Sequence, residues 1–401
     1  MGERSAMTED DVVVYAGGCF RPSGADRVGV ELEWLVYDPA APREAVPIER
    51  VRSALAGVPL TSRVTFEPGG QLELSSPTAA LLPCLLDLAR DLGSVRCALA
   101  DAGLVLVGSG IDPIRTPSRQ VTGPRYDAMA RFLGSPFGPL MMCSTASVQV
   151  NLDFGPSCGT AWERAHRLGP VLLASFANSA VLTGRPSGWM SARQAVWAGL
   201  DRTRTDPVPL TDPVEAWARY LLDARLMLVR ECADGPGEVF RPVSNGATFG
   251  DWLRDGAGLD RPPTPDDLAY HATTVFPPVR PRGWLEIRYL DAQQPWNWPV
   301  CAAVTYALIC DDRAAEAAMA AAEPLAGAWR TAARRSIADP LLRRAARTCF
   351  RAALEALPGL GADRRLVAAV SDFAETYIDP GRPPAVDFLD LIDLDQEEVR
   401  A

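Results

Sequence analysis

The chain has 401 residues, 48% of them hydrophobic and 22% charged, which is typical of a folded globular protein of one large or two ordinary domains. Its formal net charge of −10 argues against broad nucleic-acid binding, because phosphate neutralisation needs a basic surface. All 40 basic residues are arginine, and the absence of lysine excludes a P-loop, a protein kinase and a pyridoxal phosphate enzyme.

The nine cysteines are scattered without a C-x-x-C pair, and the only histidines are His166 and His271. We therefore expect neither a disulfide framework nor a histidine-rich zinc site. The N-terminus lacks a signal-peptide core, and no apolar run approaches the ~20 residues that span a bilayer. These features predict a cytoplasmic protein that binds neither nucleic acid nor membrane, and they leave its oligomeric state open.

Secondary structure is predicted from hydrophobic periodicity and turn residues, in chain order. We expect a helix over 8–20, a strand over 27–39, two short strands joined at Pro68-Gly69-Gly70 within 64–77, a helix over 77–103 and a strand over 104–110. Next come a helix over 123–133, a strand over 141–155, and helices over 160–183 and within 189–200 and 212–230. A strand over 283–293 precedes almost continuous helix from 299 to 378.

This order of elements favours one α+β domain over 1–401. It would consist of a sheet-containing core (27–295), a helical C-terminal region (296–380) and an acidic tail (381–401) that we expect to be a loosely attached cap. We find no internal repeat and no low-complexity linker.

Four of the predicted strands share a two-faced pattern. In RVGVELEWLVYDP, Glu31 and Glu33 lie on one face while the apolar residues between them lie on the other. The polar faces of the other strands add further carboxylates and amides, with only Arg288 to balance them: Gln71, Glu73, Gln149, Asn151, Asp153 and Glu286. Glu67, at the hairpin turn, is expected to join this group.

Carboxylates that converge within ~4–6 Å repel one another and force some to protonate, and a divalent cation removes this conflict. Oxygen-rich sites of this kind select Mg²⁺, Mn²⁺ or Ca²⁺, and Mg²⁺ in enzymes usually arrives with nucleotide phosphates. The pattern alone leaves two other interpretations open. One is an ordinary solvated sheet face, and the other is the carboxylate pair of a glycosidase.

A series of motifs, taken in order, resembles the plant-type glutamate–cysteine ligases, and most of all their actinobacterial branch, which supplies γ-glutamylcysteine for ergothioneine synthesis. The motifs are GVELE, FEPGGQLELS, GPRYDAM, SVQVNLDF, FANSAVLTGRPSGWMSARQAVW, HATTVFPPVR and LEIR, within 29–293. The resemblance implies a glutamine synthetase-like fold, in which the polar face of an antiparallel sheet forms the active site and helices back it. It also implies that L-glutamate, L-cysteine and ATP react, with Mg²⁺ or Mn²⁺, to give γ-glutamylcysteine, ADP and phosphate.

The same resemblance implies roles for individual residues. Arg288 and Glu286 would be catalytic, and Arg288 would face the transferring phosphoryl group. Residues expected to bind substrate or nucleotide are Arg125, Tyr126, Gln149, Asn151, Arg193 and His271, although His271 fits a structural role equally well. The expected metal ligands are Glu31, Glu33, Glu67, Glu73 and Glu286.

Some positions depart from the plant pattern. Ser144 and Ala146 replace an arginine and a cysteine of the plant strand, and Arg185 replaces a lysine, so the identity of the amine substrate stays open. Two alternatives therefore remain beside glutamate–cysteine ligation. One is a ligase of the same fold that uses another amine, and the other is a non-catalytic sensor of glutamate or ATP.

Overall fold

The computed structural model describes residues 7–24, 26–232 and 238–400. In this part of the chain, seven strands form one sheet in the order β10-β11-β5-β1-β3-β2, with β4 also paired to β1. Every pairing is antiparallel, as predicted. The strands are β1 (Val28–Tyr37), β2 (Arg63–Phe66), β3 (Leu72–Ser75), β4 (Val105–Val107), β5 (Ser147–Leu152), β10 (Val279–Pro281) and β11 (Leu285–Asp291).

The strand registers bring the polar residues of different strands side by side. Glu33 on β1 is the partner of Glu73 on β3, and Glu31 is the partner of Gln149 on β5. Glu286 on β11 pairs with Asn151, at the other edge of β5. Because side chains alternate between the faces of a sheet, these registers collect the carboxylates and amides on one face.

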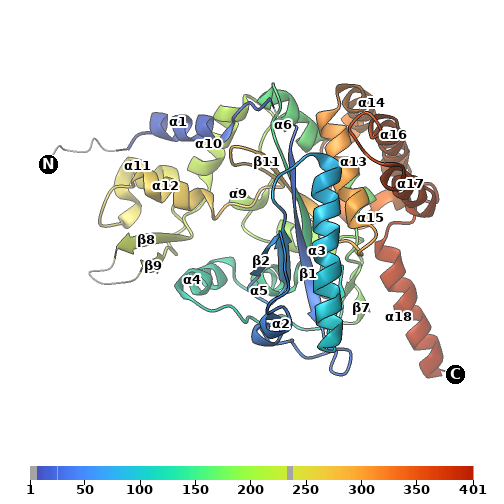
Figure 1. The fold of residues 1–401 in the computed structure, drawn as a ribbon. Coiled ribbons are helices and arrows are strands. Elements are labelled where there is room, and N and C mark those ends of the chain that lie inside the picture. The colour runs from blue at the N-terminus through green and yellow to red at the C-terminus, as the bar shows by residue number, and fades with distance from the viewer. Residues whose placement is uncertain (1–6, 25, 233–237, 401) are drawn as a thin grey trace.

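The opposite face of the sheet is buried under helices. Val30, Leu32, Val150 and Ile287 are at most 1% exposed. Helix α3 (Leu81–Asp101) runs alongside β1 in Figure 1 and buries one stripe of apolar residues at helical spacing: Leu81, Leu85, Leu88, Leu92, Val95 and Leu99. Helices α6 (Cys158–Arg167), α7 (Gly169–Ser175) and α13 (Trp298–Cys310) complete this layer.

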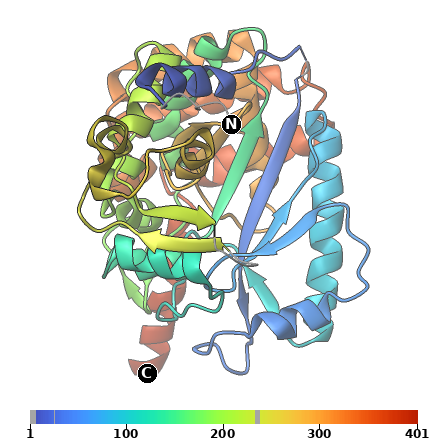
Figure 2. The same ribbon diagram turned by 90° about the vertical axis from the view of Figure 1, so that its left-hand side faces the viewer.

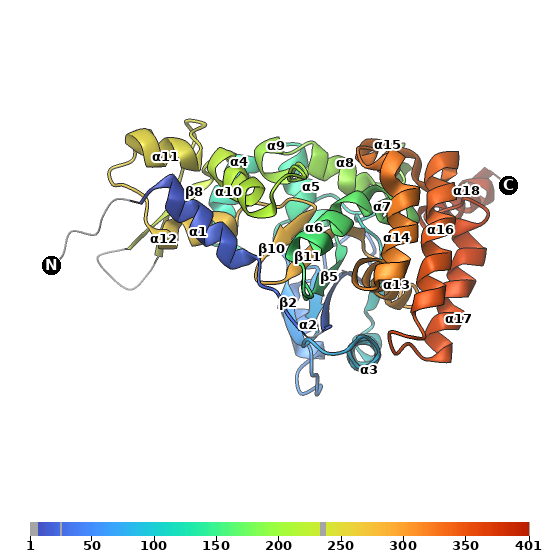
Figure 3. The ribbon, with the colours of Figure 1, turned by 90° about the horizontal axis from the view of Figure 1, so that it is seen from above.

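The C-terminal third is helical, as predicted, and packs behind the sheet on the side away from the polar face (Figure 3). Aspartates cap three of these helices by accepting from their first backbone N–H groups. One apolar core includes both sheet and C-terminal residues. The helices are α14 (Asp312–Ala322), α15 (Trp329–Arg335), α16 (Pro340–Ala356) and α17 (Arg364–Phe373), with a π-helical turn at Ala374–Ile378.

Figure 2 looks onto the polar face, with the yellow hairpin and teal α4 on one side of it and α3 at the other edge. The elements on the hairpin side are α1 (Glu9–Cys19), α4 (Pro124–Leu133), α5 (Phe137–Ser144), α10 (Pro213–Asp223), β8 (Leu228–Cys232), β9 (Glu238–Pro242), α11 (Phe249–Asp255) and α12 (Pro265–Ala272). Shorter elements connect these layers: α2 (Ile48–Ala54), β6 (Val181–Leu182), β7 (Arg185–Pro186), α8 (Ala192–Ala198) and α9 (Arg202–Thr205).

Two predicted boundaries are wrong. Residues 141–144 of the predicted strand end helix α5, where the hydroxyl of Thr145 donates to the carbonyl of Met141 at 2.6 Å. The helix predicted over 160–183 ends at Ser175. Each error falls on a short apolar run, whose periodicity does not distinguish a buried strand from a buried helix.

The acidic tail is helix α18 (Ala385–Arg400). Its first turn is joined to the body, because the N–H of Ala385 donates to the carbonyl of Ala177 at 3.0 Å and the hydroxyl of Tyr377 donates to Asp387 at 2.8 Å. The loosely attached cap of the prediction is therefore a helix anchored at its start. Among the described residues, no helix is both long and apolar enough to cross a membrane.

The turn between β2 and β3 predicts a specific cost for a glycine substitution. A Cβ on Gly69 would lie 2.2 Å from the carbonyl oxygen of Cys143, so the Gly69→Ala variant should lose about 1–3 kcal/mol of unfolding free energy. Gly93, on the exposed side of α3, has open space around it, and Gly93→Ala should instead gain ~0.5–1 kcal/mol. Chemical denaturation of both variants measures the difference, and equal stabilities would contradict the close packing of this turn.

Candidate active site

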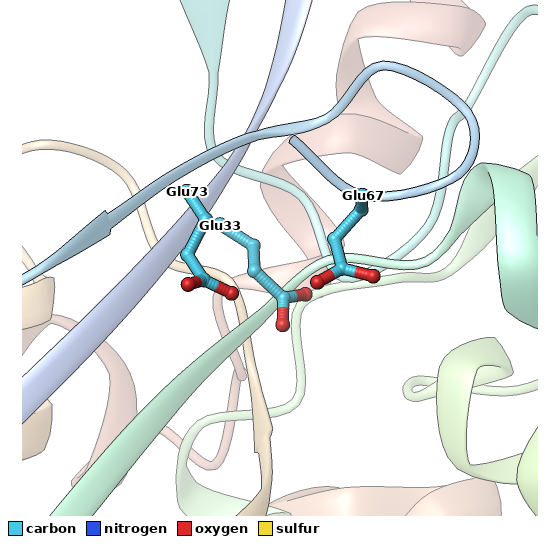
Figure 4. A group of neighbouring side chains, drawn as sticks. All are labelled: Glu33, Glu67 and Glu73. Carbon is cyan, nitrogen blue, oxygen red and sulfur yellow. The ribbon is translucent and has the colours of Figure 1, made fainter. Parts of the chain in front are cut away.

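Three carboxylates converge at one end of the polar face. Glu33 comes from β1, Glu73 from β3 and Glu67 from the turn after β2, and Figure 4 shows their side chains pointing toward one another. Each offers a carboxylate oxygen, and these oxygens lie within 4.8 Å of one another. The structure thus brings together three of the five predicted metal ligands.

Backbone geometry places Glu67 in this group. The N–H of Glu67 donates to the carbonyl of Gln71 at 2.9 Å, and the N–H of Gly70 donates to the carbonyl of Glu67 at 2.8 Å. The side chain of Gln71 links the turn to the start of β5 by donating to the carbonyl of Thr145 at 2.9 Å. The conformation of the turn therefore determines where the third carboxylate lies.

The pKa values show the repulsion that the sequence pattern implied. Burial, followed by the charges of Glu33 and Glu73, raises the pKa of Glu67 to about 8. Burial and then Glu73 also raise the pKa of Glu33. The pKa of Glu31 rises to about 7, because it is buried and faces Glu286 and Glu73. These carboxylates resist ionisation together unless a cation joins them.

The donor set of this group fits a hard divalent cation. Only part of the hydrogen-bonding capacity of these carboxylates is used within the protein: Glu33 accepts from the N–H of Ser147 at 2.8 Å and from Gln149 at 2.9 Å. Glu73 accepts from the hydroxyls of Thr65 and Ser75 through one oxygen. Clustered carboxylate oxygens suit Mg²⁺ or Mn²⁺, whereas the site offers no thiolate or imidazole that would favour a softer metal.

Arginines surround the carboxylate at the other end of the face. Arg280 contacts Glu286 through Nε at 2.6 Å and Nη2 at 3.1 Å, and Arg288 lies 3.3 Å from it. Burial alone would raise the pKa of Glu286, but the charges of Arg280 and then Arg288 lower it to about 2. Glu286 therefore stays ionised as the partner of arginines, and it lies outside the three-carboxylate group.

The expectation that only Arg288 balances the acidic face is wrong. Arg280 faces Glu286 across the β10–β11 pair, and Arg282 approaches it to 3.4 Å. Strand β10 has three residues and ends in a proline, so the sequence offered no alternating pattern to identify it.

Gln149 connects the two ends of the face. Its amide nitrogen donates to Glu33, while its amide oxygen accepts from Nη1 of Arg288 at 2.6 Å. This arrangement holds the Arg288 side chain, which is 14% exposed, toward the three carboxylates. Gln149 also lines the cavity of this site.

Arg193 is buried beside this floor. Its Nη2 donates to the backbone carbonyl of Arg288 at 2.9 Å, and its side chain is 3% exposed. Among the described residues, Nε and Nη1 of Arg193 have no hydrogen-bond partner. Nη1 lies 3.9 Å from the carboxylate of Asp291, so Nε is the atom that remains available to a bound anion.

The site is a cavity of about 280 Å³. A larger cavity of about 670 Å³ lies next to it. Arg125, Thr273, Arg280 and Arg282 line both cavities. Tyr126 also lines the smaller cavity. Residues that the sequence reasoning missed form its apolar wall: Met129, Met141, Met142, Trp197 and Phe276.

Three polar residues lie away from this cavity. His271 is packed in the interior, where its Nε2 contacts the carbonyl of Leu221 at 3.0 Å, and burial lowers its pKa to about 3. Asn151 lies further along the sheet, where it donates to Glu31 at 2.9 Å. Asp153 follows the end of β5 and accepts from Ser23.

An antiparallel sheet that is backed by helices and carries carboxylates and arginines on its open face has the architecture of the glutamine synthetase-like ligases. The glutamate–cysteine ligase of Francisella tularensis, solved in complex with AMP, matches this fold with a TM-score of 0.50. The match covers 92% of this chain and 85% of that chain at 12% sequence identity, so it shows the fold alone. The predicted fold class is confirmed.

Sequence similarity identifies the family. Residues 27–401 match glutamate–cysteine ligase family 2 (GCS2), and the chain belongs to this family. It is 42% identical over 394 residues to the glutamate–cysteine ligase EgtA of Mycobacterium tuberculosis, which covers 94% of this chain and 88% of that protein. It is also 29% identical over 332 residues to the chloroplastic glutamate–cysteine ligase of Nicotiana tabacum. That match covers 73% of this chain and 60% of the tobacco protein. The predicted resemblance and the enzyme class, glutamate–cysteine ligase, are confirmed.

The raised carboxylate pKa values predict a metal effect that depends on pH. Above the ordinary glutamate pKa of 4.5, the metal-free fold loses stability as pH rises, and the loss grows until pH passes the folded-state values of about 7 and about 8. Mg²⁺ or Mn²⁺ held by the ionised carboxylates should therefore raise the melting temperature more at about pH 8 than at about pH 6.

Thermal unfolding with and without each metal at both pH values measures this effect. The Glu67→Gln variant is the control, because it removes one charge of the group while keeping the size of the side chain. Its metal-free form should melt higher than wild type at about pH 8 and gain less from metal. A metal-induced shift that depends on neither pH nor Glu67 would place the cation elsewhere.

Proposed function

We propose that the protein joins the γ-carboxylate of L-glutamate to the amine of L-cysteine, with ATP as co-substrate and a γ-glutamyl phosphate as intermediate. The observation that carries this proposal is the position of the buried Arg288 and Arg193 next to the group of Glu33, Glu67 and Glu73. A site that transfers a phosphoryl group to a carboxylate needs negative side chains to hold the cations that accompany ATP. It also needs positive side chains to hold the oxyanions.

Each step follows from the chemistry of a carboxylate. The γ-carboxylate is a poor electrophile, so its oxygen first attacks the γ-phosphorus of ATP, and ADP leaves. A cation on Glu33, Glu67 and Glu73 would neutralise phosphate charge. Arg288 donates to the equatorial oxygens of the transferring group, where charge develops. The cysteine amine then attacks the acyl carbon, and phosphate leaves with the proton that the amine loses.

The larger cavity suits the nucleotide. Among the described residues that line it are four arginines, Arg21, Arg125, Arg280 and Arg282, and no carboxylate. Trp217 and Tyr15 add aromatic surface on which a base can pack. Because this cavity adjoins the site at Arg125, Arg280 and Arg282, phosphates bound there would extend toward the three carboxylates.

The smaller cavity suits the two amino acids. The unpartnered Nε of Arg193 can donate to a substrate carboxylate. The wall opposite the sheet, with Met129, Met141 and Met142, offers a soft apolar surface to the small thiol side chain of cysteine. An amine substrate with a charged side chain would lose the hydration of that charge against this wall.

The product, γ-glutamylcysteine, would enter ergothioneine synthesis or the synthesis of a related small thiol, in line with the sequence resemblance. The similarity to a ligase named EgtA supports this role. The cytoplasmic location stays a prediction from the sequence.

The reaction predicts ADP release that depends on cysteine. With glutamate, ATP and Mg²⁺ present, adding L-cysteine should increase ADP formation, while L-serine, L-lysine or L-aspartate at the same concentration should add little. A coupled assay for ADP, with mass spectrometry of the peptide product, measures both. A stronger response to another amine would indicate the alternative ligase, and binding of glutamate or ATP without turnover would indicate a sensor.

Arg288 is expected to contribute to transition-state binding. The Arg288→Ala variant should lose about 3–4 kcal/mol of transition-state stabilisation, which corresponds to a decrease of roughly two to three decades in kcat. Arg96→Ala, at an exposed position of α3, is the matched control and should keep normal kcat. Near-normal turnover of Arg288→Ala, with its folding confirmed by circular dichroism, would exclude this role.

A further inference from the structure

The strand that carries Arg288 is interrupted at that residue. Ile287 pairs with Val150 and Leu290 pairs with Val148, so β11 uses one residue more than β5 between the same two pairings. This is a β-bulge, which bends a strand, re-aims a side chain and leaves backbone groups outside the ladder. In this bulge the carbonyls of Arg288 and Tyr289 are bonded by side chains.

Helix α8 supplies both of those side chains. Nη2 of Arg193 donates to the carbonyl of Arg288 at 2.9 Å, and Nε2 of Gln194 donates to the carbonyl of Tyr289 at 3.0 Å. Two consecutive residues of one helix therefore hold the two consecutive carbonyls of the bulge. The conformation that aims Arg288 at Gln149 thus depends on where α8 begins.

The start of α8 is in turn held by one buried carboxylate on β11 itself. Asp291, 2% exposed, accepts from the hydroxyl of Ser179 at 2.7 Å and from that of Ser191 at 2.9 Å. Each hydroxyl then accepts from a backbone N–H of the helix: Ser179 from Arg193 and Ser191 from Gln194, both at 3.2 Å. The backbone N–H of Asn178 also donates to Asp291, at 2.9 Å.

These contacts form a closed loop from β11 through two serines to α8 and back to β11. Asp291 also lies 3.9 Å from Nη1 of Arg193, which places a negative charge behind the guanidinium. A Cβ on Gly110 would lie 2.5 Å from the carboxyl carbon of Asp291, so the surrounding backbone leaves the carboxylate little freedom to move.

We propose that Asp291 is a positioning residue that, through Ser179, Ser191 and the first turn of α8, fixes both Arg193 and the bulge that aims Arg288. This inference rests on the proposed function, in which those two arginines contact substrate and the transferring group. Asp291 itself lines neither of the two cavities of the site. Its carboxylate matters because it accepts hydrogen bonds from both serine hydroxyls. The lone pairs of the serine oxygens are then free to accept from the N–H groups of the helix.

The test compares Asp291→Asn with Asp91→Asn in the full-length enzyme. Asp91 is also buried, and it accepts from the backbone N–H groups of Thr61 and Ser62, away from α8. Asn at 291 replaces one acceptor with a donor, so the two serines lose their common orientation. Asp291→Asn should lower kcat and raise the KM for glutamate, so that kcat/KM for glutamate falls by about 10–100-fold. The KM for ATP should stay within about twofold of wild type.

Asp91→Asn should lose thermal stability and keep all three kinetic constants. If Asp291→Asn behaves in the same way, its role is structural and the proposal is overturned. If the wild-type enzyme shows no cysteine-dependent ADP release, the proposed function fails instead, so the two failures are distinguishable.

A second variant covers the case in which Asp291→Asn does not fold. Gln194 is half-buried, and Gln194→Met keeps its length while removing only the bond to the carbonyl of Tyr289. This variant should fold with a kcat about 3–10-fold below wild type and an unchanged KM for ATP. An unchanged kcat for Gln194→Met would overturn the proposal, because the bond from α8 to the carbonyl of Tyr289 would then have no part in aiming Arg288.

Discussion

Repulsion between like charges on one face of a sheet is the constraint on which the rest of this structure depends. Glu33, Glu67 and Glu73 offer carboxylate oxygens within 4.8 Å of one another, and the elevated pKa of Glu67 expresses the cost of ionising them together. A soluble sheet face of ordinary composition does not concentrate charge in this way. The arrangement is tolerable when a cation or a proton joins the group. The clustered carboxylates therefore indicate a site that binds a cation.

The same face stabilises the buried carboxylate of Glu286 in the opposite way. Glu286 lies between Arg280, Arg282 and Arg288, and its pKa falls to about 2 instead of rising. Two carboxylates on one sheet thus differ in pKa by several units because their neighbours differ in sign. The acidic end can attract metal, the basic end can attract oxyanions, and Gln149 keeps a fixed spacing between the two by bonding to both.

Precision in this site comes from contacts between segments that are far apart in the chain. The Glu67 turn is held by the start of β5 through Gln71, and the Arg288 bulge is held by the first turn of α8. Among the described residues, those of the C-terminal helices line neither cavity, but they share one apolar core with the sheet. The buried core thus gives the rigidity that a preorganised charged site requires.

The sequence by itself determined the alternation of β1, β3, β5 and β11, the helical stripe of α3 and the helical C-terminal third. Each of these follows from a local period of two or about 3.6 residues, which is readable without knowing the neighbours. For the same reason it identified Glu31, Glu33, Glu73, Gln149 and Arg288 as members of one polar face.

Only the tertiary structure decided which of these residues meet. Strand order and register bring Glu33 beside Glu73 and separate Glu286 from these two carboxylates. They also place Arg280 against Glu286. The bulge at Arg288 has no local signature, and neither does the loop of contacts through Asp291, because both arise from pairing between distant segments. Local periodicity defines a face, whereas long-range packing decides its neighbours, its charge balance and the direction in which each side chain points.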